Sequence, residues 1–144
     1  MTTQPEEPMI ADEAYPLGKT SPGTITASQT DELTHALKFL QARIVANNIE
    51  KGWRINDGRR RNFGELCMLI DSETAEAFEC FRNGEPLLHY ADNGKPEGMA
   101  SELADIIIRV LDVADEYDAP VIQALFEKHA FNLTRAYRHG GKAC

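Results

Sequence analysis

Two pairs of carboxylates, each with its members three residues apart, constrain how this chain can fold. The pairs are Glu73 with Glu76, and Glu102 with Asp105. Residues three apart lie on the same face of an α-helix, so each pair presents its oxygens in one direction. If the two helices pack together, four carboxylates converge, and like charges at such short range are unfavourable unless a cation lies between them. The spacing therefore predicts two packed helices with a metal site between them.

Glu73 lies inside the apolar face of its predicted helix. At 100° per residue, five apolar side chains fall within about 60° of it, namely Leu66, Leu69, Ile70, Ala77 and Cys80. A charge in such a face must be compensated. The alternative to a metal is that these are surface acids of amphipathic helices, paired with Arg82 or Arg109. Arg109 is also spaced to pair with Asp105 or Asp112 along its own helix.

Helical periodicity of apolar residues recurs in four segments, and no segment has a convincing strand pattern. We expect helices over residues 30–50, 63–82, 99–117 and 120–138, with Thr30 or Asp31 as the first cap and Pro120 in the first turn of the last helix. Residues 85–98 are expected to form a loop. The fold class is predicted to be all-α, a four-helix bundle that oligomerisation completes, because its wide apolar arcs exceed what a monomer buries.

Composition changes near residue 28. Residues 1–28 contain four of the seven prolines, many Thr and Ser residues, and little periodicity. We interpret them as a flexible N-terminal arm. Residues 29–144 then form one all-α domain.

Charge and cysteine usage exclude several classes of partner. The formal net charge is -8 and the pI about 5.0, which argues against nucleic acid as a partner. The three cysteines form no CxxC motif and fit a reducing cytosol. There is no basic, apolar leader and no apolar run of membrane-spanning length, so we expect a cytoplasmic protein without a membrane partner.

The candidate metal donors are all carboxylate oxygens, which suit Mg²⁺ or Mn²⁺. A basic segment without acids begins at Lys128. Lys128, Asn132 and Arg135 share one face of the last predicted helix, where they can bind triphosphate oxygens through charge-assisted hydrogen bonds. The alternative is that these cations only complement the dipole at a helix C-terminus.

Trp53, the only tryptophan, follows the first predicted helix. It either stacks on a nucleobase, as a substrate-binding residue, or closes the core. Asn47 and Asn48, in the last turn of that helix, could read the edge of a base.

The sequence ETAE at 73–76, followed by ELAD at 102–105, resembles the ExxE…ExxD signature of the MazG-like superfamily of all-α nucleoside triphosphate pyrophosphohydrolases. The flanking segments 63–84 and 101–114 and the C-terminal KHAFNLTRAYRHGGK also resemble this family, so that the similarity covers about residues 30–142. Many members have a further Glu where this chain has Ser72, which leaves the group that activates water unidentified.

The resemblance implies a helical bundle that forms dimers or tetramers. Such a protein would bind Mg²⁺ through Glu73, Glu76, Glu102 and Asp105 and hydrolyse an NTP or dNTP to the monophosphate and pyrophosphate. Glu73 and Glu76 would also be catalytic residues. Two alternatives remain: a pyrophosphohydrolase of phosphoribosyl or modified nucleotides, and a non-catalytic helical dimer that acts as a binding or interaction module.

Overall fold

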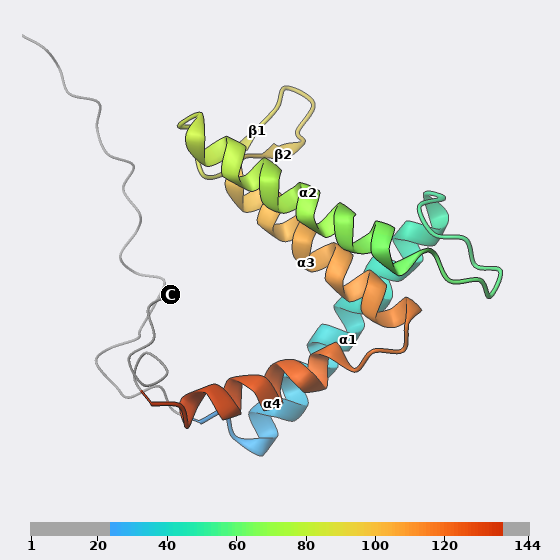
Figure 1. The fold of residues 1–144 in the computed structure, drawn as a ribbon, viewed down its shortest axis with the longest axis vertical. Coiled ribbons are helices and arrows are strands. Elements are labelled where there is room, and N and C mark those ends of the chain that lie inside the picture. The colour runs from blue at the N-terminus through green and yellow to red at the C-terminus, as the bar shows by residue number, and fades with distance from the viewer. Residues whose placement is uncertain (1–23, 137–144) are drawn as a thin grey trace, which may run out of the picture.

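The structure, a computed structural model, describes residues 24–136 and consists mostly of four α-helices (Figure 1). In chain order the elements are α1 (Ala27–Glu50), α2 (Phe63–Arg82), β1 (His89–Tyr90), β2 (Pro96–Glu97), α3 (Met99–Glu116) and α4 (Val121–Leu133). The predicted all-α class is confirmed. Residues 1–23 of the predicted arm, and the basic tail from residue 137 onward, lie outside the described residues. Within residues 24–136, no helix is long and apolar enough to cross a membrane.

Side-chain caps define where the first two helices begin. The hydroxyl of Thr26 accepts a hydrogen bond from the backbone N–H of Gln29, whose own side chain accepts from the N–H of Thr26. This reciprocal capping box starts α1 at Ala27, so the expected cap at Thr30 or Asp31 was wrong. The predicted bounds of α2 are confirmed, and Asn62 caps this helix by accepting from the N–H of Glu65.

The helices α2 and α3 lie side by side and antiparallel, and the short β1–β2 hairpin lies in the connection between them (Figure 1). The sequence predicted only a loop here, because two-residue strands show no alternation. Gly98 joins the hairpin to α3 with a φ of +97°. A Cβ atom at this position would lie 2.5 Å from the carbonyl oxygen of Pro86. Glycine is therefore required where the chain turns into the helix that carries Glu102.

The last helix is shorter than predicted. It ends at Leu133, and the hydroxyl of the C-cap residue Thr134 donates to the carbonyl oxygen of Phe131 at 2.8 Å. Pro120 is the N-cap and not a residue of the first turn. The main packing partner of α4 is α1, which in turn packs on α3.

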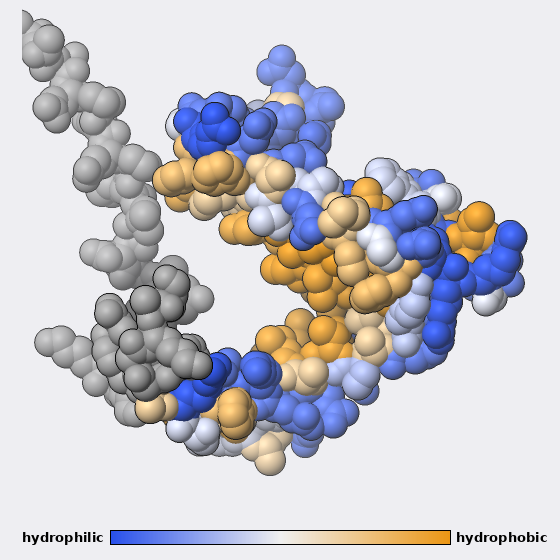
Figure 2. All heavy atoms as spheres, viewed as in Figure 1, coloured by the Kyte–Doolittle hydropathy of each residue, from blue (hydrophilic) through white to orange (hydrophobic). Residues whose placement is uncertain are grey.

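Few apolar side chains of the described residues are buried. The buried apolar residues are Leu66, Ala77, Leu111, Ala114 and Ile122, and no large side chain of residues 24–136 is fully buried. Phe78, Phe81 and Ile107 expose 59%, 68% and 58% of their surface. The α2–α3 pair diverges from α4 (Figure 1), and Figure 2 shows apolar side chains on the faces that these helices turn toward each other.

Candidate metal centre and adjoining pocket

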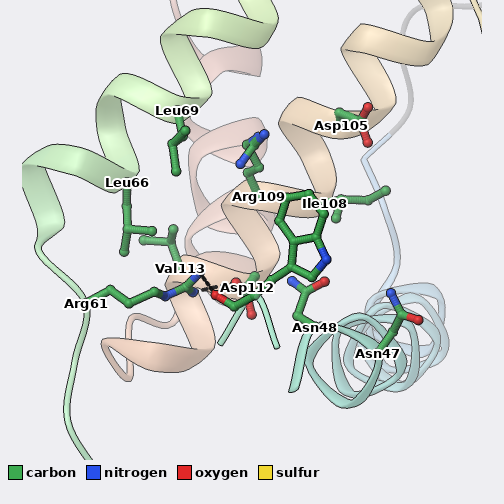
Figure 3. Close-up of a pocket in the computed structure, with 11 residues that line it drawn as sticks. Asn47, Asn48, Arg61, Leu66, Leu69, Asp105, Ile108, Arg109, Asp112 and Val113 are labelled. Carbon is green, nitrogen blue, oxygen red and sulfur yellow. Dashed lines mark hydrogen bonds and ion pairs between the residues drawn. The ribbon is translucent and has the colours of Figure 1, made fainter. Parts of the chain in front are cut away.

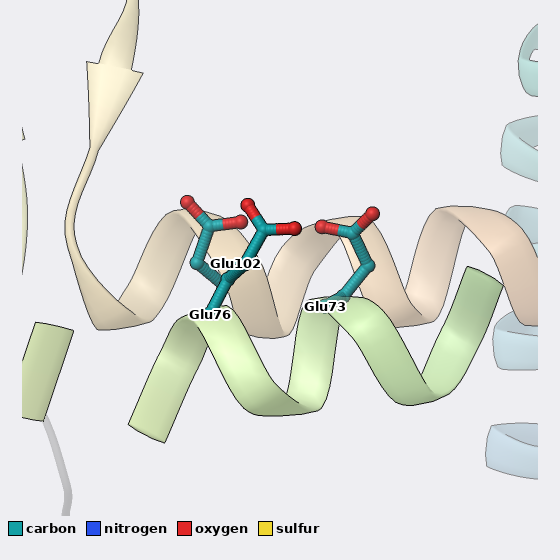
Figure 4. Close-up of side chains that lie close together, drawn as sticks. All are labelled: Glu73, Glu76 and Glu102. Atoms are coloured by element: carbon teal, nitrogen blue, oxygen red, sulfur yellow. The ribbon is translucent and has the colours of Figure 1, made fainter. Parts of the chain in front are cut away.

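Three of the four predicted ligands converge between α2 and α3 (Figure 4). Glu73, Glu76 and Glu102 each place a carboxylate oxygen within 4.8 Å of the others. Glu73 is buried, Glu102 is half-buried and Glu76 is exposed. We call these three residues the acid cluster. Its position follows from the i,i+3 spacing on α2 and from the direct packing of α2 on α3.

Crowding of negative charge is visible at Glu102. Burial raises the pKa of this carboxyl above its ordinary value, and the nearby charges of Glu76, Glu73 and Asp105 raise it further. A cation bound among these oxygens would remove the repulsion. The cluster therefore has the charge and the converging oxygens that could hold a cation.

Asp105, the fourth predicted ligand, does not belong to the group of three. It lines the adjoining pocket, where burial and the negative charge of Glu73 raise its pKa while Arg109 and Lys95 act in the opposite direction. Asp105 is thus in electrostatic range of the acid cluster, one helical turn away from Glu102.

Arg109 pairs with Glu73 across the interface of α2 and α3. Its Nε and Nη2 atoms donate to the same oxygen, Oε1 of Glu73, at 2.8 and 2.5 Å. The predicted pairing of Arg109 with Asp105 or Asp112 along its own helix was wrong. The alternative reading of Glu73, as an acid paired with Arg109, is what the geometry shows. Glu73 therefore forms an ion pair with Arg109 and is also one of the three carboxylates of the acid cluster.

A cavity of about 310 Å³ (Figure 3) lies next to the cluster, because its lining includes Arg109, the partner of Glu73. Its polar lining includes Asn47 and Asn48 from the end of α1, Asp105 and Arg109 from α3, and Trp53 from the following loop. Trp53 is 68% exposed, so the interpretation that it closes the core was wrong. Its backbone N–H donates to the carbonyl oxygen of Asn48 at 2.9 Å, which holds the indole-bearing residue beside both asparagines.

Sequence reasoning missed a network that fastens the loop after α1 to α3. Arg61 donates through Nε to Glu116 at 2.8 Å and through Nη2 to Asp112 at 2.5 Å. Both acids are buried. Burial opposes ionisation of Glu116, but the hydrogen bonds from Arg61 prevail and hold its pKa below the ordinary value. Arg61 also donates to the carbonyl oxygen of Trp53 at 3.3 Å, so the network fixes one wall of the pocket.

The remaining arginines of this loop are paired too. Arg54 lies 2.8 Å from Asp115, Arg59 pairs with Asp57, and Arg60 lies 2.6 Å from Asp118. The concentration of arginines at positions 54 and 59–61 was the available signal for this network, although it did not identify their partners.

The predicted phosphate-binding residues of α4 do not meet the acids within this chain. Lys128, Asn132 and Arg135 are exposed, and α4 packs chiefly on α1. The Nζ atom of Lys128 lies 5.6 Å from the ring centroid of Phe131, and the guanidinium carbon of Arg135 lies 6.0 Å from it. Arg135 follows the C-cap, so its predicted place on the helical face was wrong.

Comparisons of the chain with models of protein families, with curated proteins and with solved structures found no match. The site is therefore interpreted from its own chemistry. It offers three converging carboxylates, an arginine bonded to one of them, and a pocket with one aromatic and two amide side chains.

Proposed function

We propose that this protein is a Mg²⁺-dependent nucleoside triphosphate pyrophosphohydrolase of MazG-like type. The observation that carries the proposal is the convergence of Glu73, Glu76 and Glu102 beside a pocket lined by Trp53. The pair of ExxE and ExxD motifs, and the resemblance that it supports, point to the same activity.

The donor set fits a small, hard cation. Carboxylate oxygens are the protein ligands that Mg²⁺ and Mn²⁺ prefer. Two oxygens bound to one Mg²⁺, each at about 2.1 Å, lie about 3–4 Å apart. The present separations within 4.8 Å would close through small side-chain rotations. Asp105 would complete the ligand set by a similar rotation from the pocket wall.

When bound, Mg²⁺ would neutralise charge on the phosphates and lower the pKa of the attacking water. The residues of the chain would do the rest. Trp53 would stack on the base, and the amides of Asn47 and Asn48 would bind its polar edge. Hydrolysis adds water across the anhydride bond between the α and β phosphorus atoms, giving the nucleoside monophosphate and pyrophosphate.

Self-association belongs to the same proposal. The large exposed side chains Phe78, Phe81 and Ile107 would be buried by further copies of the chain. Lys128 of α4 and Arg135 just after it would then reach phosphate from a neighbouring copy, because within one chain α4 packs chiefly on α1. Light scattering should give a mass that is a multiple of 16.1 kDa, and a monomer at micromolar concentration would contradict this part of the proposal.

Pyrophosphate release is the decisive measurement. A panel of NTPs, dNTPs, phosphoribosyl nucleotides and modified nucleotides should be incubated with the full chain and Mg²⁺ or Mn²⁺. We expect Glu76→Gln and Glu102→Gln to reduce release at least about 100-fold, since each removes a charged metal ligand. Glu79→Gln, an exposed acid of the same helix, is the matched control and should keep full activity. Absence of release from every substrate would refute the proposal.

The ion pair of Glu73 with Arg109 favours a second candidate function. This pair compensates the buried carboxylate without any metal, as in a non-catalytic helical module whose acids are structural. Calorimetry separates the two candidates, because a scaffold of this kind should show no Mg²⁺-dependent binding of nucleotide.

A further inference from the structure

Among residues 24–136, Arg109 is the cation that contacts both parts of the candidate site. It donates to Glu73 of the acid cluster, and it also lines the 310 Å³ pocket, whose lining does not include the three glutamates. Its side chain is 27% exposed. Figure 3 shows the guanidinium among the side chains of the pocket. Arg109 therefore links the pocket to the acid cluster by a direct contact.

Only one edge of Arg109 is used. Both of its hydrogen bonds, from Nε and Nη2, end on Oε1 of Glu73. Within residues 24–136, Nη1 of Arg109 makes no hydrogen bond, and a hydrogen bond with Glu102 joins Glu73 to the acid cluster. The guanidinium therefore retains donor capacity for the pocket.

The other arginine of the pocket, Arg61, already uses its donors in hydrogen bonds within the protein. Arg61 bonds to Asp112 and Glu116 with three of its nitrogen atoms and to the carbonyl oxygen of Trp53. It has no comparable free edge. Arg109 is thus the guanidinium that an anionic ligand in this pocket can engage, and guanidinium groups bind phosphate through paired hydrogen bonds.

We propose that Arg109 is a phosphate-binding residue that couples the pocket to the acid cluster. One edge of its guanidinium holds Glu73, and the other donates to a phosphate oxygen of a ligand in the pocket. The link to a metal rests on the proposed function, whereas the phosphate contact does not.

Replacement of Arg109 should change the affinities for phosphate and for a divalent cation in opposite directions. Without Arg109, the pocket loses a charge-assisted donor, so a phosphate ligand binds more weakly. The acid cluster loses a neighbouring positive charge, so a divalent cation binds more tightly. A residue that merely supports the fold would weaken both ligands when replaced.

The experiment uses calorimetry on the full chain at pH 8, with two probes applied separately. The first probe is inorganic pyrophosphate with chelator and no metal, and the second is Mn²⁺ alone. We expect Arg109→Gln to weaken the binding of pyrophosphate by about 10- to 100-fold, the range for a charged hydrogen bond. The same variant should bind Mn²⁺ about tenfold more tightly, the effect of one unit charge near a solvated site.

Two further variants complete the design. Arg109→Lys keeps the charge but not the two-edged geometry, so it should leave Mn²⁺ affinity near wild type and still weaken pyrophosphate. Arg82→Gln removes an exposed arginine of α2 and should change neither affinity. Circular dichroism checks that each variant is helical.

Two results would overturn the inference: unchanged pyrophosphate affinity in Arg109→Gln, or equal weakening of both probes in Arg109→Gln and Arg109→Lys. These outcomes are distinct from failure of the proposed function. If the protein releases pyrophosphate from a nucleotide but its pyrophosphate affinity does not depend on Arg109, the proposed function stands and the role of Arg109 is refuted. If the protein has no activity but its pyrophosphate affinity depends on Arg109, the role of Arg109 stands and the proposed function is refuted.

Discussion

Arg109 of α3 donates two hydrogen bonds to a single oxygen of Glu73 of α2. The bond pair joins the two helices beside the acid cluster, and its carboxylate is buried whereas its guanidinium is partly exposed. The pair therefore has a stabilising role that is independent of any ligand, and this role can be measured by itself.

We expect a double-mutant cycle of Glu73→Gln and Arg109→Gln to give a coupling energy of about 1–2 kcal/mol in metal-free protein. Each single change leaves the remaining charged side chain without its oppositely charged partner. The double variant should therefore be more stable than the sum of the two single effects implies. Urea denaturation at pH 7 measures the free energies of unfolding. Additive effects would show that the two side chains do not interact in solution.

Arg61 should matter more for stability than any other arginine of its loop. Arg61→Ala leaves Asp112 and Glu116 buried without their main partner, and we expect a loss of about 3 kcal/mol in the free energy of unfolding. Arg59→Ala is the matched control: its side chain is 82% exposed and its partner Asp57 is on the surface, so no measurable change is expected. Equal effects of the two variants would contradict this interpretation of the network.

The comparison of sequence and structure shows what local patterns can predict. The bounds of α2 follow from Asn62, from the apolar period and from Asn83-Gly84, all of which act within a few residues. The same period placed Glu73 on the face that packs against α3. The acid cluster could thus be predicted once α2 was assumed to pack on α3, because i,i+3 spacing is a local property of each helix.

Local patterns did not identify the partners of Arg61, which is separated from Asp112 by 51 residues and from Glu116 by 55. Arg109 is 36 residues from Glu73, and its pairing with the predicted metal-binding acids was predicted only as one alternative beside pairing along its own helix. The sequence does not say which face of α3 meets α2. The end of α4 was predicted too late for another reason: apolar spacing continues beyond Leu133, whereas the cap at Thr134 depends on local hydrogen bonding.

Glu102 should make the stability of the metal-free protein depend on pH. Its pKa is raised in the folded state by burial and by neighbouring acids, so the folded protein binds its proton more tightly than the unfolded chain does. Stability is then lost as pH rises from about 4.3, the ordinary value for Glu, through the raised pKa. Glu102→Gln removes this loss, so the variant should be more stable than wild type at pH 7.

The two proteins should converge in stability below pH 4, where Glu102 is protonated in both the folded and the unfolded states. Measurements of unfolding at several pH values with chelator test this expectation. With saturating Mg²⁺ the order at pH 7 should reverse, because the cation stabilises the acids of the wild type. A stability difference that does not vary with pH would show that Glu102 is not crowded by negative charge.

Trp53 offers a direct readout of the pocket, because it is the only tryptophan of the chain and most of its surface is exposed. A nucleotide that stacks on the indole should change its fluorescence and protect it from quenching by acrylamide. Trp53→Phe should weaken nucleotide binding by about 10-fold, since stacking on an aromatic ring contributes about 1–3 kcal/mol per base and Phe retains part of it. Replacement of the exposed Phe39 on α1 by Leu is the control and should leave nucleotide affinity unchanged. If saturating nucleotide with Mg²⁺ leaves the acrylamide quenching of Trp53 unaltered, the base binds elsewhere.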